Sequence, residues 1–129
     1  MNDRRNFLTT LALAASAQAQ TRAPARLAGT QSLPAPFEGW EASFIEVTAG
    51  AGSAPPHRHA GFVLGYVIDG EFRFATHDQP ERVIPAGGTF YEPPGSVHTV
   101  SASAKADRPA KILAIIIAEK GKELTTFEK

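Results

Sequence analysis

The chain has 129 residues, which suits a single domain. Its 13 lysines and arginines balance its 13 acidic residues, so charge gives no reason to expect nucleic acid or an anionic membrane as a partner. The sequence contains no cysteine, which excludes disulfides, thiolate metal ligands and thiol nucleophiles. Any chemistry must therefore use histidines, carboxylates and hydroxyls.

The first 19 residues have the anatomy of an export signal. Arg4 and Arg5 give a basic start, an apolar stretch follows over residues 7–15, and a small-x-small triplet places the expected cleavage after Ala19. The apolar stretch is too short to span a bilayer. The run Arg-Arg-Asn-Phe-Leu resembles the twin-arginine class of signals, while its flanking residues leave ordinary secretion open. We expect a bacterial periplasmic or secreted protein that is not membrane-bound after cleavage.

The mature chain carries the pattern of an all-β domain. Residues 20–36 are rich in Ala and Pro, and we expect a flexible N-terminal arm with at most one short strand near residues 26–31. After Trp40, apolar or alternating segments recur roughly every 8–12 residues between Gly/Pro turns, which is typical of a sandwich or barrel. The predicted strands are residues 41–48, 57–68 (continuous or broken at Gly61), 71–76, 81–85, 89–92, 97–101 and 110–118.

The last of these segments is apolar apart from Lys111, so we expect both of its faces to be covered. No helix is predicted. We place one barrel domain at residues 37–118 and a C-terminal tail of uncertain shape at residues 119–129.

Three histidines are the candidates for a metal site. His57 and His59 are two residues apart on a predicted strand, so they project from the same face. A third ligand from across the barrel would complete a site that leaves positions open for water or substrate. His98, just after a Pro-Pro-Gly turn, is the best-placed third ligand. An exposed His-x-His pair without a metal is the alternative.

The same segments resemble the two signature motifs of the cupin superfamily. Those motifs run G-x5-H-x-H-x(3,4)-E-x6-G and G-x5-P-x-G-x2-H-x3-N. The second motif fits at Gly87, Pro93, Gly95 and His98; the first fits at His57, His59 and Gly70, with its opening glycine out of register. The chain is thus similar to a small single-domain cupin of the conserved-barrel type. This resemblance implies a single jelly-roll β-barrel and the pairing of two copies into a homodimer.

The resemblance also shows what this chain lacks. The family's carboxylate ligand falls at Val63, or at Leu64 with the longer spacing, and neither side chain can bind a metal. The family's closing asparagine is replaced by Ala102. The resemblance therefore implies a three-histidine site for a divalent ion, whose identity among Fe, Mn, Ni and Zn stays open. Some cupins without the glutamate have lost the metal as well, but the three histidines favour a bound ion.

Other polar residues receive weaker assignments. Glu92, beside the Pro-Pro-Gly turn, is the candidate for a catalytic carboxylate near the site, with a surface or salt-bridging role as the alternative. His77 lies beside Asp78 in a predicted turn, and we expect it to be solvated. Arg58 must point to the opposite strand face from the two flanking histidines.

These features lead to a functional expectation. Three neutral imidazoles leave the charge of a divalent ion uncompensated, which favours a small anionic substrate. We expect an exported metal-dependent enzyme, with oxygen-dependent cleavage of an enolate-type substrate as the first reaction to test. Isomerisation or lactone hydrolysis stays open, and so does a non-catalytic module that captures a small ligand, because one fold hosts many functions.

Overall fold

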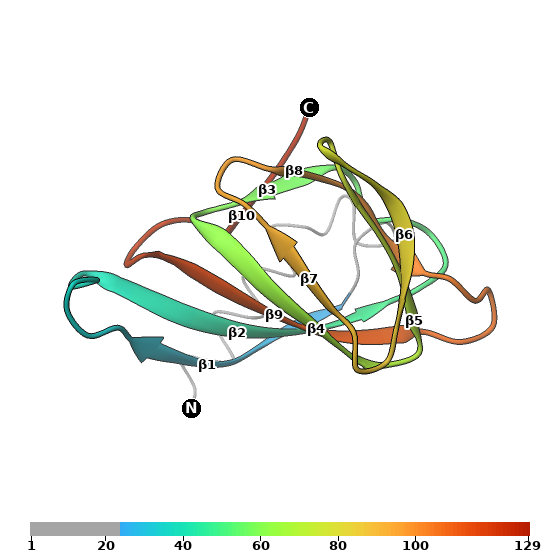
Figure 1. Cartoon of the computed structure of the whole chain (residues 1–129), viewed down its shortest axis with the longest axis horizontal. Helices are drawn as coiled ribbons and strands as arrows, with labels where there is room; N and C mark the ends of the chain where they lie inside the picture. Colours follow the sequence, from blue (N-terminus) through green and yellow to red (C-terminus); the bar gives the residue numbers. More distant parts are fainter. Residues whose placement is uncertain (1–23) are drawn as a thin grey trace.

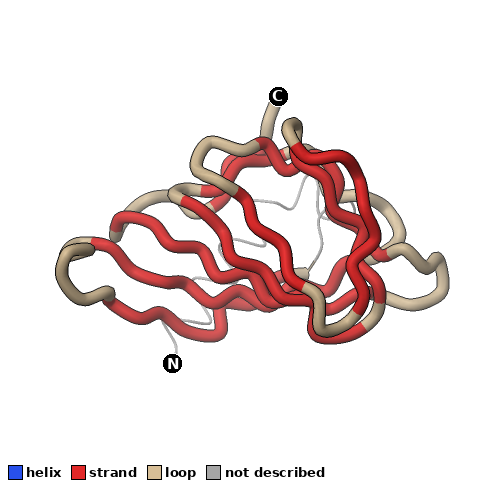
Figure 2. Tube along the Cα trace, viewed as in Figure 1, coloured by secondary structure: helices blue, strands red, loops and turns tan. Residues whose placement is uncertain are grey.

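The described part of the protein consists of strands and turns. The computed structural model describes residues 24–129, so the export signal predicted at residues 1–19 lies outside the described residues. Figure 2 shows strands and loops only in this part, which confirms the all-β prediction. Accordingly, residues 24–129 contain no helix long and apolar enough to cross a membrane. The strands are β1 (Ala25–Ser32), β2 (Trp40–Ala49), β3 (His57–His59), β4 (Phe62–Asp69), β5 (Glu71–Thr76), β6 (Gln79–Pro85), β7 (Thr89–Glu92), β8 (Val97–Ser103), β9 (Ala110–Glu119) and β10 (Thr125–Phe127).

The strands form two five-stranded antiparallel sheets. One sheet has the order β1-β2-β9-β4-β7, and the other has the order β10-β3-β8-β5-β6. The chain crosses repeatedly from one sheet to the other, as in a jelly roll. In Figure 1, β3, β8 and β10 lie together at one end of the barrel, although they come from distant parts of the sequence.

Alternating side chains build the core between the sheets. Phe72 and Phe74 of β5 are fully buried, as their alternation with polar neighbours predicted. The Phe90 ring lies 5.3 Å from the Phe72 ring and 4.8 Å from the Phe74 ring, measured between centroids. The three rings form one aromatic layer across the barrel.

A glycine divides the predicted 57–68 segment. Gly61 has a φ of 61°, and a Cβ atom there would overlap the backbone carbonyl of Ile117. Only glycine accepts this conformation at this distance from a neighbouring strand. The chain therefore leaves one sheet after β3 and enters the other as β4. The two-strand alternative is the observed one.

Three segments can be compared with the sequence-based expectation. The arm at residues 20–36 contains β1, close to the short strand expected near residues 26–31, and β1 pairs with β2 of its own chain. The tail at residues 119–129 contains β10, which pairs with β3. The outer face of β9 is half-buried rather than covered, since only alternate residues face the core. β1 and β10 lie at the edges of their sheets. Edge strands depend on their partners and carry little signal in the sequence.

The close contact between Gly65 and Phe90 generates a stability prediction. A Cβ atom at Gly65 would overlap the Phe90 ring, whereas a Cβ atom at Gly29 of β1 would meet nothing within 4 Å. We expect Gly65→Ala to lower the free energy of unfolding by about 1–3 kcal/mol, because the aromatic layer must shift. Gly29→Ala is the matched control and should change it by less than about 0.5 kcal/mol. Urea denaturation of both variants checks this, and equal effects would contradict the packing account.

Candidate metal centre

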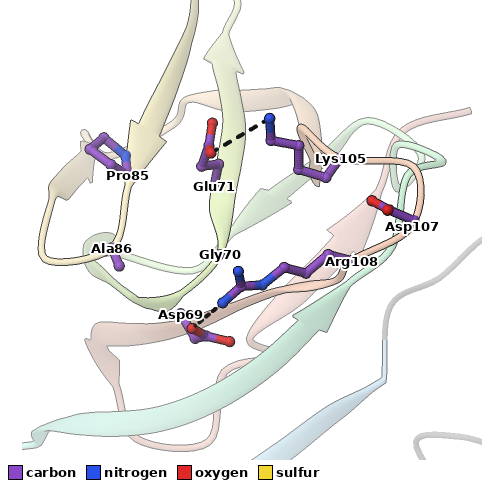
Figure 3. Close-up of a pocket in the computed structure, with 8 residues that line it drawn as sticks. All are labelled: Asp69, Gly70, Glu71, Pro85, Ala86, Lys105, Asp107 and Arg108. Carbon is purple, nitrogen blue, oxygen red and sulfur yellow. Dashed lines mark hydrogen bonds and ion pairs between the residues drawn. The ribbon is translucent and has the colours of Figure 1, made fainter.

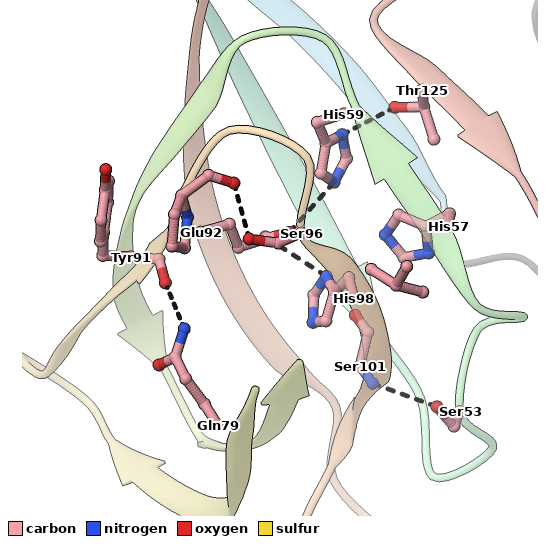
Figure 4. Close-up of polar contacts among 12 residues, drawn as sticks. Ser53, His57, His59, Gln79, Tyr91, Glu92, Ser96, His98, Ser101 and Thr125 are labelled. Atoms are coloured by element: carbon pink, nitrogen blue, oxygen red, sulfur yellow. Dashed lines mark hydrogen bonds and ion pairs between the residues drawn. The ribbon is translucent and has the colours of Figure 1, made fainter. Parts of the chain in front are cut away.

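Two strands bring the three candidate histidines together. His57 and His59 project from the same face of β3, and β3 pairs with β8 so that His57 lies directly opposite His98. Each histidine offers one ring nitrogen, and these three nitrogens all lie within 4.8 Å of one another. The His57 centroid is 4.9 Å from that of His59 and 4.8 Å from that of His98. Figure 4 shows the three rings gathered at this end of the barrel.

The Nδ1 atoms of both β3 histidines already have hydrogen-bond partners. His57 Nδ1 lies 2.8 Å from the Pro55 carbonyl. His59 Nδ1 lies 3.2 Å from the Leu124 carbonyl and 3.0 Å from Thr125 Oγ1. A carbonyl oxygen only accepts, so Nδ1 donates, and the lone pair of each ring resides on Nε2. This orients both histidines as metal ligands commonly are.

Burial keeps the His59 and His98 imidazoles neutral. It lowers the pKa of His59 to about 4, and the neighbouring His57 shifts it in the same direction, against the opposing effect of the hydrogen bond that His59 donates to the Leu124 carbonyl. Burial also lowers the pKa of His98 well below its usual value, with His57 and His59 adding to the effect. Neutral imidazole is the form that binds a metal, so no proton needs to leave these rings near neutral pH.

Glu92 is part of this cluster and not a surface residue. Its side chain is 3% exposed, and β7 pairs with β4 so that Glu92 lies opposite Val63. Glu92 Oε2 lies 3.3 Å from His98 Nδ1, and Oε1 lies 3.9 Å from His59 Nε2. Figure 4 shows the carboxylate between these two rings. Burial raises the pKa of Glu92 to about 8.

Unsatisfied polar atoms show that the cluster suits a cation. Within residues 24–129, Glu92 Oε1 and both ring nitrogens of His98 are buried without a hydrogen-bond partner. Buried polar groups are costly unless something satisfies them, so each calls for an explanation. A divalent ion accepts electron pairs from imidazole nitrogen and carboxylate oxygen, the donors that converge here. The residues therefore fit a divalent metal.

Aromatic side chains surround the polar cluster. The His98 ring lies 5.0 Å from Phe74 and 6.3 Å from Phe72, and the His57 ring lies 5.5 Å from Phe127. Val63, at the position of the family's carboxylate, is fully buried beside Glu92, whereas Leu64 points outward. The surroundings are thus apolar, which strengthens any electrostatic interaction inside.

The remaining candidates lie away from the cluster. His77 is exposed and lies 3.1 Å from Asp78, as expected for a turn residue. Arg58 is exposed on the other face of β3 and forms an ion pair with Glu128. Both assignments from the sequence therefore agree with the structure.

A surface pocket lies at the far end of β5 from the histidines. Figure 3 shows its two ion pairs, Asp69 with Arg108 and Glu71 with Lys105. Its other lining residues are Gly70, Pro85, Ala86 and Asp107. It contains no histidine and no buried unpaired group, so it is not the centre of chemistry.

Sequence reasoning missed the role of the C-terminal strand. Leu124, just before β10, supplies the carbonyl beside His59, and β10 itself supplies the Thr125 hydroxyl beside His59 and the Phe127 ring that packs on His57. The segment Thr-Thr-Phe has alternation and β propensity, but it is too short to stand out among polar neighbours.

The hydroxyl beside His59 generates a prediction about metal affinity. Thr125→Val should weaken Zn2+ binding about tenfold, because outer partners of ligating histidines fix ring orientation and basicity. The matched control is Thr126→Val, since Thr126 is exposed and alternates to the other side of β10. Titration calorimetry with Zn2+ measures both variants, and equal affinities would show that Thr125 does not orient His59.

Comparison with known proteins agrees with this architecture. The cupin domain family model matches residues 43–116. No curated protein matches the chain. The structure is similar to an uncharacterised conserved protein with a double-stranded β-helix domain from Klebsiella pneumoniae (14% identity, 84% of this chain and 85% of that chain, TM-score 0.63).

It is also similar to a cupin-like protein from Thermotoga maritima (19% identity, 67% of this chain and 64% of that chain, TM-score 0.58). An oxalate oxidase in complex with the substrate analogue glycolate is a further match (23% identity, 69% and 46% coverage, TM-score 0.55). This chain thus spans less than two thirds of the length of these two proteins. The family match covers more than half of the sequence and includes both strands that carry the histidines, so the chain belongs to the cupin family.

Proposed function

We propose that this cupin is an exported metal-dependent enzyme that acts on a small organic anion, with His57, His59 and His98 holding a divalent ion. The observation that carries the proposal is the convergence of three histidine ring nitrogens within 4.8 Å of one another. Oxygen-dependent cleavage of an enolate-type substrate is the reaction we propose first. Export is supported by the N-terminal pattern of the sequence.

Charge supports an anionic substrate. A bound divalent ion would act as a Lewis acid and would stabilise negative charge that develops on a substrate oxygen. The three histidines add no negative charge of their own, and the nearby Glu92 would cancel at most one of the two charges of the ion, so a net positive charge would remain to attract an anion. The oxalate oxidase that shares the fold was solved with glycolate, also a small organic anion, which is consistent with this substrate class.

Residues of the chain orient the metal-binding histidines and exclude water from the site. His57 and His59 are fixed through their Nδ1 atoms, so their Nε2 atoms stay directed inward. Phe74 and Val63 exclude water from the inner side of the site. Low local polarity makes a fixed charge more effective than it would be in water.

Removal of one ligand tests the metal site directly. Protein isolated from the exported fraction, with Gln20 as its expected N-terminal residue, should contain about one divalent ion per chain. His98→Ala should lose most of this metal, because two imidazoles rarely hold a labile ion. The matched control is His77→Ala, which removes an exposed histidine and its hydrogen bond from Val97 N–H but no metal-facing nitrogen, so this variant should retain the metal. Elemental analysis of both variants measures the outcome.

A His98→Ala variant that keeps its metal would contradict the proposal. Turnover of small carboxylates with oxygen consumption would identify the first reaction, and metal-dependent turnover without oxygen uptake would point to isomerisation or lactone hydrolysis. Ligand binding that survives metal removal would favour a non-catalytic module.

We also propose that two copies associate through the outer face of the β1-β2-β9-β4-β7 sheet. One apolar row crosses four strands of this face through Phe44, Ile115, Leu64 and Tyr91. Leu64 and Tyr91 are 43% and 46% exposed, and Tyr66 beside them is also exposed. Large contiguous apolar patches mark association sites, and one self-complementary patch suits a two-fold dimer.

A charge placed on this face should separate the copies. Wild-type protein is expected to show twice the chain mass by light scattering at micromolar concentration, and Leu64→Lys should show the mass of one chain. The matched control is Val83→Lys, because Val83 is 51% exposed but lies on β6 of the other sheet. A monomeric wild-type protein would refute the proposal.

A further inference from the structure

The carboxylate that this cupin lacks on β4 has a counterpart on the adjacent strand. Val63 is fully buried and faces the barrel interior. In the antiparallel pair of β4 and β7, the residue directly opposite Val63 is Glu92. Directly opposite residues project from the same face, with Cβ atoms about 4.5–5.5 Å apart. A carboxylate on β7 at this register therefore points into the same region as one on β4.

The contacts place the Glu92 oxygens beside the metal-facing side of the cluster. Since His59 Nδ1 is held by Leu124 and Thr125, its Nε2 faces inward. Glu92 Oε1 lies 3.9 Å from that Nε2 atom. Its other oxygen lies 3.3 Å from His98 Nδ1. Donor atoms about 2.0–2.2 Å from one ion lie roughly 3–4 Å from each other, so these separations suit ligands that share an ion.

Burial leaves Glu92 without a protein partner of opposite charge. Glu92 is 3% exposed, and no lysine or arginine pairs with it among the ion pairs of residues 24–129. An isolated buried carboxylate is costly, so without a cation Glu92 is held in its protonated form. A divalent ion at the cluster would supply the positive charge that the neutral histidines lack and would take the place of that proton.

We propose that Glu92 is the fourth metal ligand, so that the site has three histidines and one glutamate, with the carboxylate moved from β4 to β7. This inference rests on the proposed three-histidine metal site. It gives Glu92 a ligand role in place of the catalytic role suggested by its position beside the Pro-Pro-Gly turn. The alternative is that Glu92 only orients His98 through a hydrogen bond and does not touch the metal.

Affinity measurements test the charge of the ligand. Glu92→Gln keeps the shape and hydrogen-bonding capacity of the side chain but removes its negative charge. We expect Zn2+ and Mn2+ to bind at least about 100-fold more weakly. Loss of a residue that only orients a ligand weakens metal binding by about 10- to 100-fold, so the expected loss lies at or beyond the top of that range. Glu38→Gln is the matched control, because Glu38 is exposed in the turn between β1 and β2. Thermal unfolding verifies that both variants are folded.

An exchange of residues tests the position of the ligand. The double variant Val63→Glu with Glu92→Val returns the carboxylate to β4 and preserves the Val–Glu pair across the two strands. We expect it to bind Zn2+ within about tenfold of the wild-type protein, whereas Glu92→Val alone should bind it about 100-fold more weakly. An exchange variant as weak as Glu92→Val would overturn the proposal.

A crystal structure of the Zn2+-loaded protein gives the direct readout. A Glu92 oxygen about 2.0–2.2 Å from the ion supports the ligand assignment. Glu92 oxygens beyond about 3 Å from the ion, with one bonded to His98, would overturn it while leaving the three-histidine site intact. Failure of the three-histidine site itself would appear differently, as a wild-type protein whose Zn2+ binding does not depend on His98.

Discussion

The pairing of β3 with β8 is the constraint on which the candidate site depends. It aligns only His57 with His98 and Arg58 with Val97, yet it joins two motifs that are far apart in the sequence. A shift of one residue in this register would turn His98 away from the interior. The turn at Pro93–Gly95 and the break at Gly61 fix where β8 begins and β3 ends, so both contribute to this register.

The site combines strongly polar groups with an apolar surrounding. Phe72, Phe74 and Phe90 form the layer beneath His98, and Gly65 leaves the space that the Phe90 ring occupies. Such a layer is well packed and does not rearrange easily. It keeps the imidazoles neutral by burial and holds Glu92 among them. Burial makes these polar groups energetically costly in the folded protein, and the same burial leaves them suited to bind a cation.

The sequence predicted the fold more completely than the site. Gly/Pro turns and alternating apolar residues located most strands, and the spacing of His57, His59 and His98 identified the cluster. β1 was expected only as a short strand, and its pairing with β2 extends it to eight residues. The strand that was missed is β10, whose order depends on pairing with β3. Thr125 and Phe127 reach the histidines only through that pairing.

The position of Glu92 could not be predicted for a related reason. Whether its side chain points inward depends on the register of β7 against β4, and a one-residue change would exchange it with Tyr91. The same register distinguishes Val63 from Leu64, which the two permitted motif spacings left unresolved. Cross-strand register is set by the assembled barrel and has little local signature.

Neighbouring residues of β7 therefore serve two surfaces. Tyr91 faces outward in the apolar row with Leu64, and Glu92 faces inward beside His59 and His98. One short backbone segment is shared, so an event that orders one face lowers the entropic cost of ordering the other. If two copies associate and the site binds an ion, as proposed, thermodynamic linkage makes this relation reciprocal: association would strengthen ion binding by the same factor by which the ion strengthens association. The apparent affinity for the ion would then depend on protein concentration, and a dilute sample would hold its ion less tightly than a concentrated one.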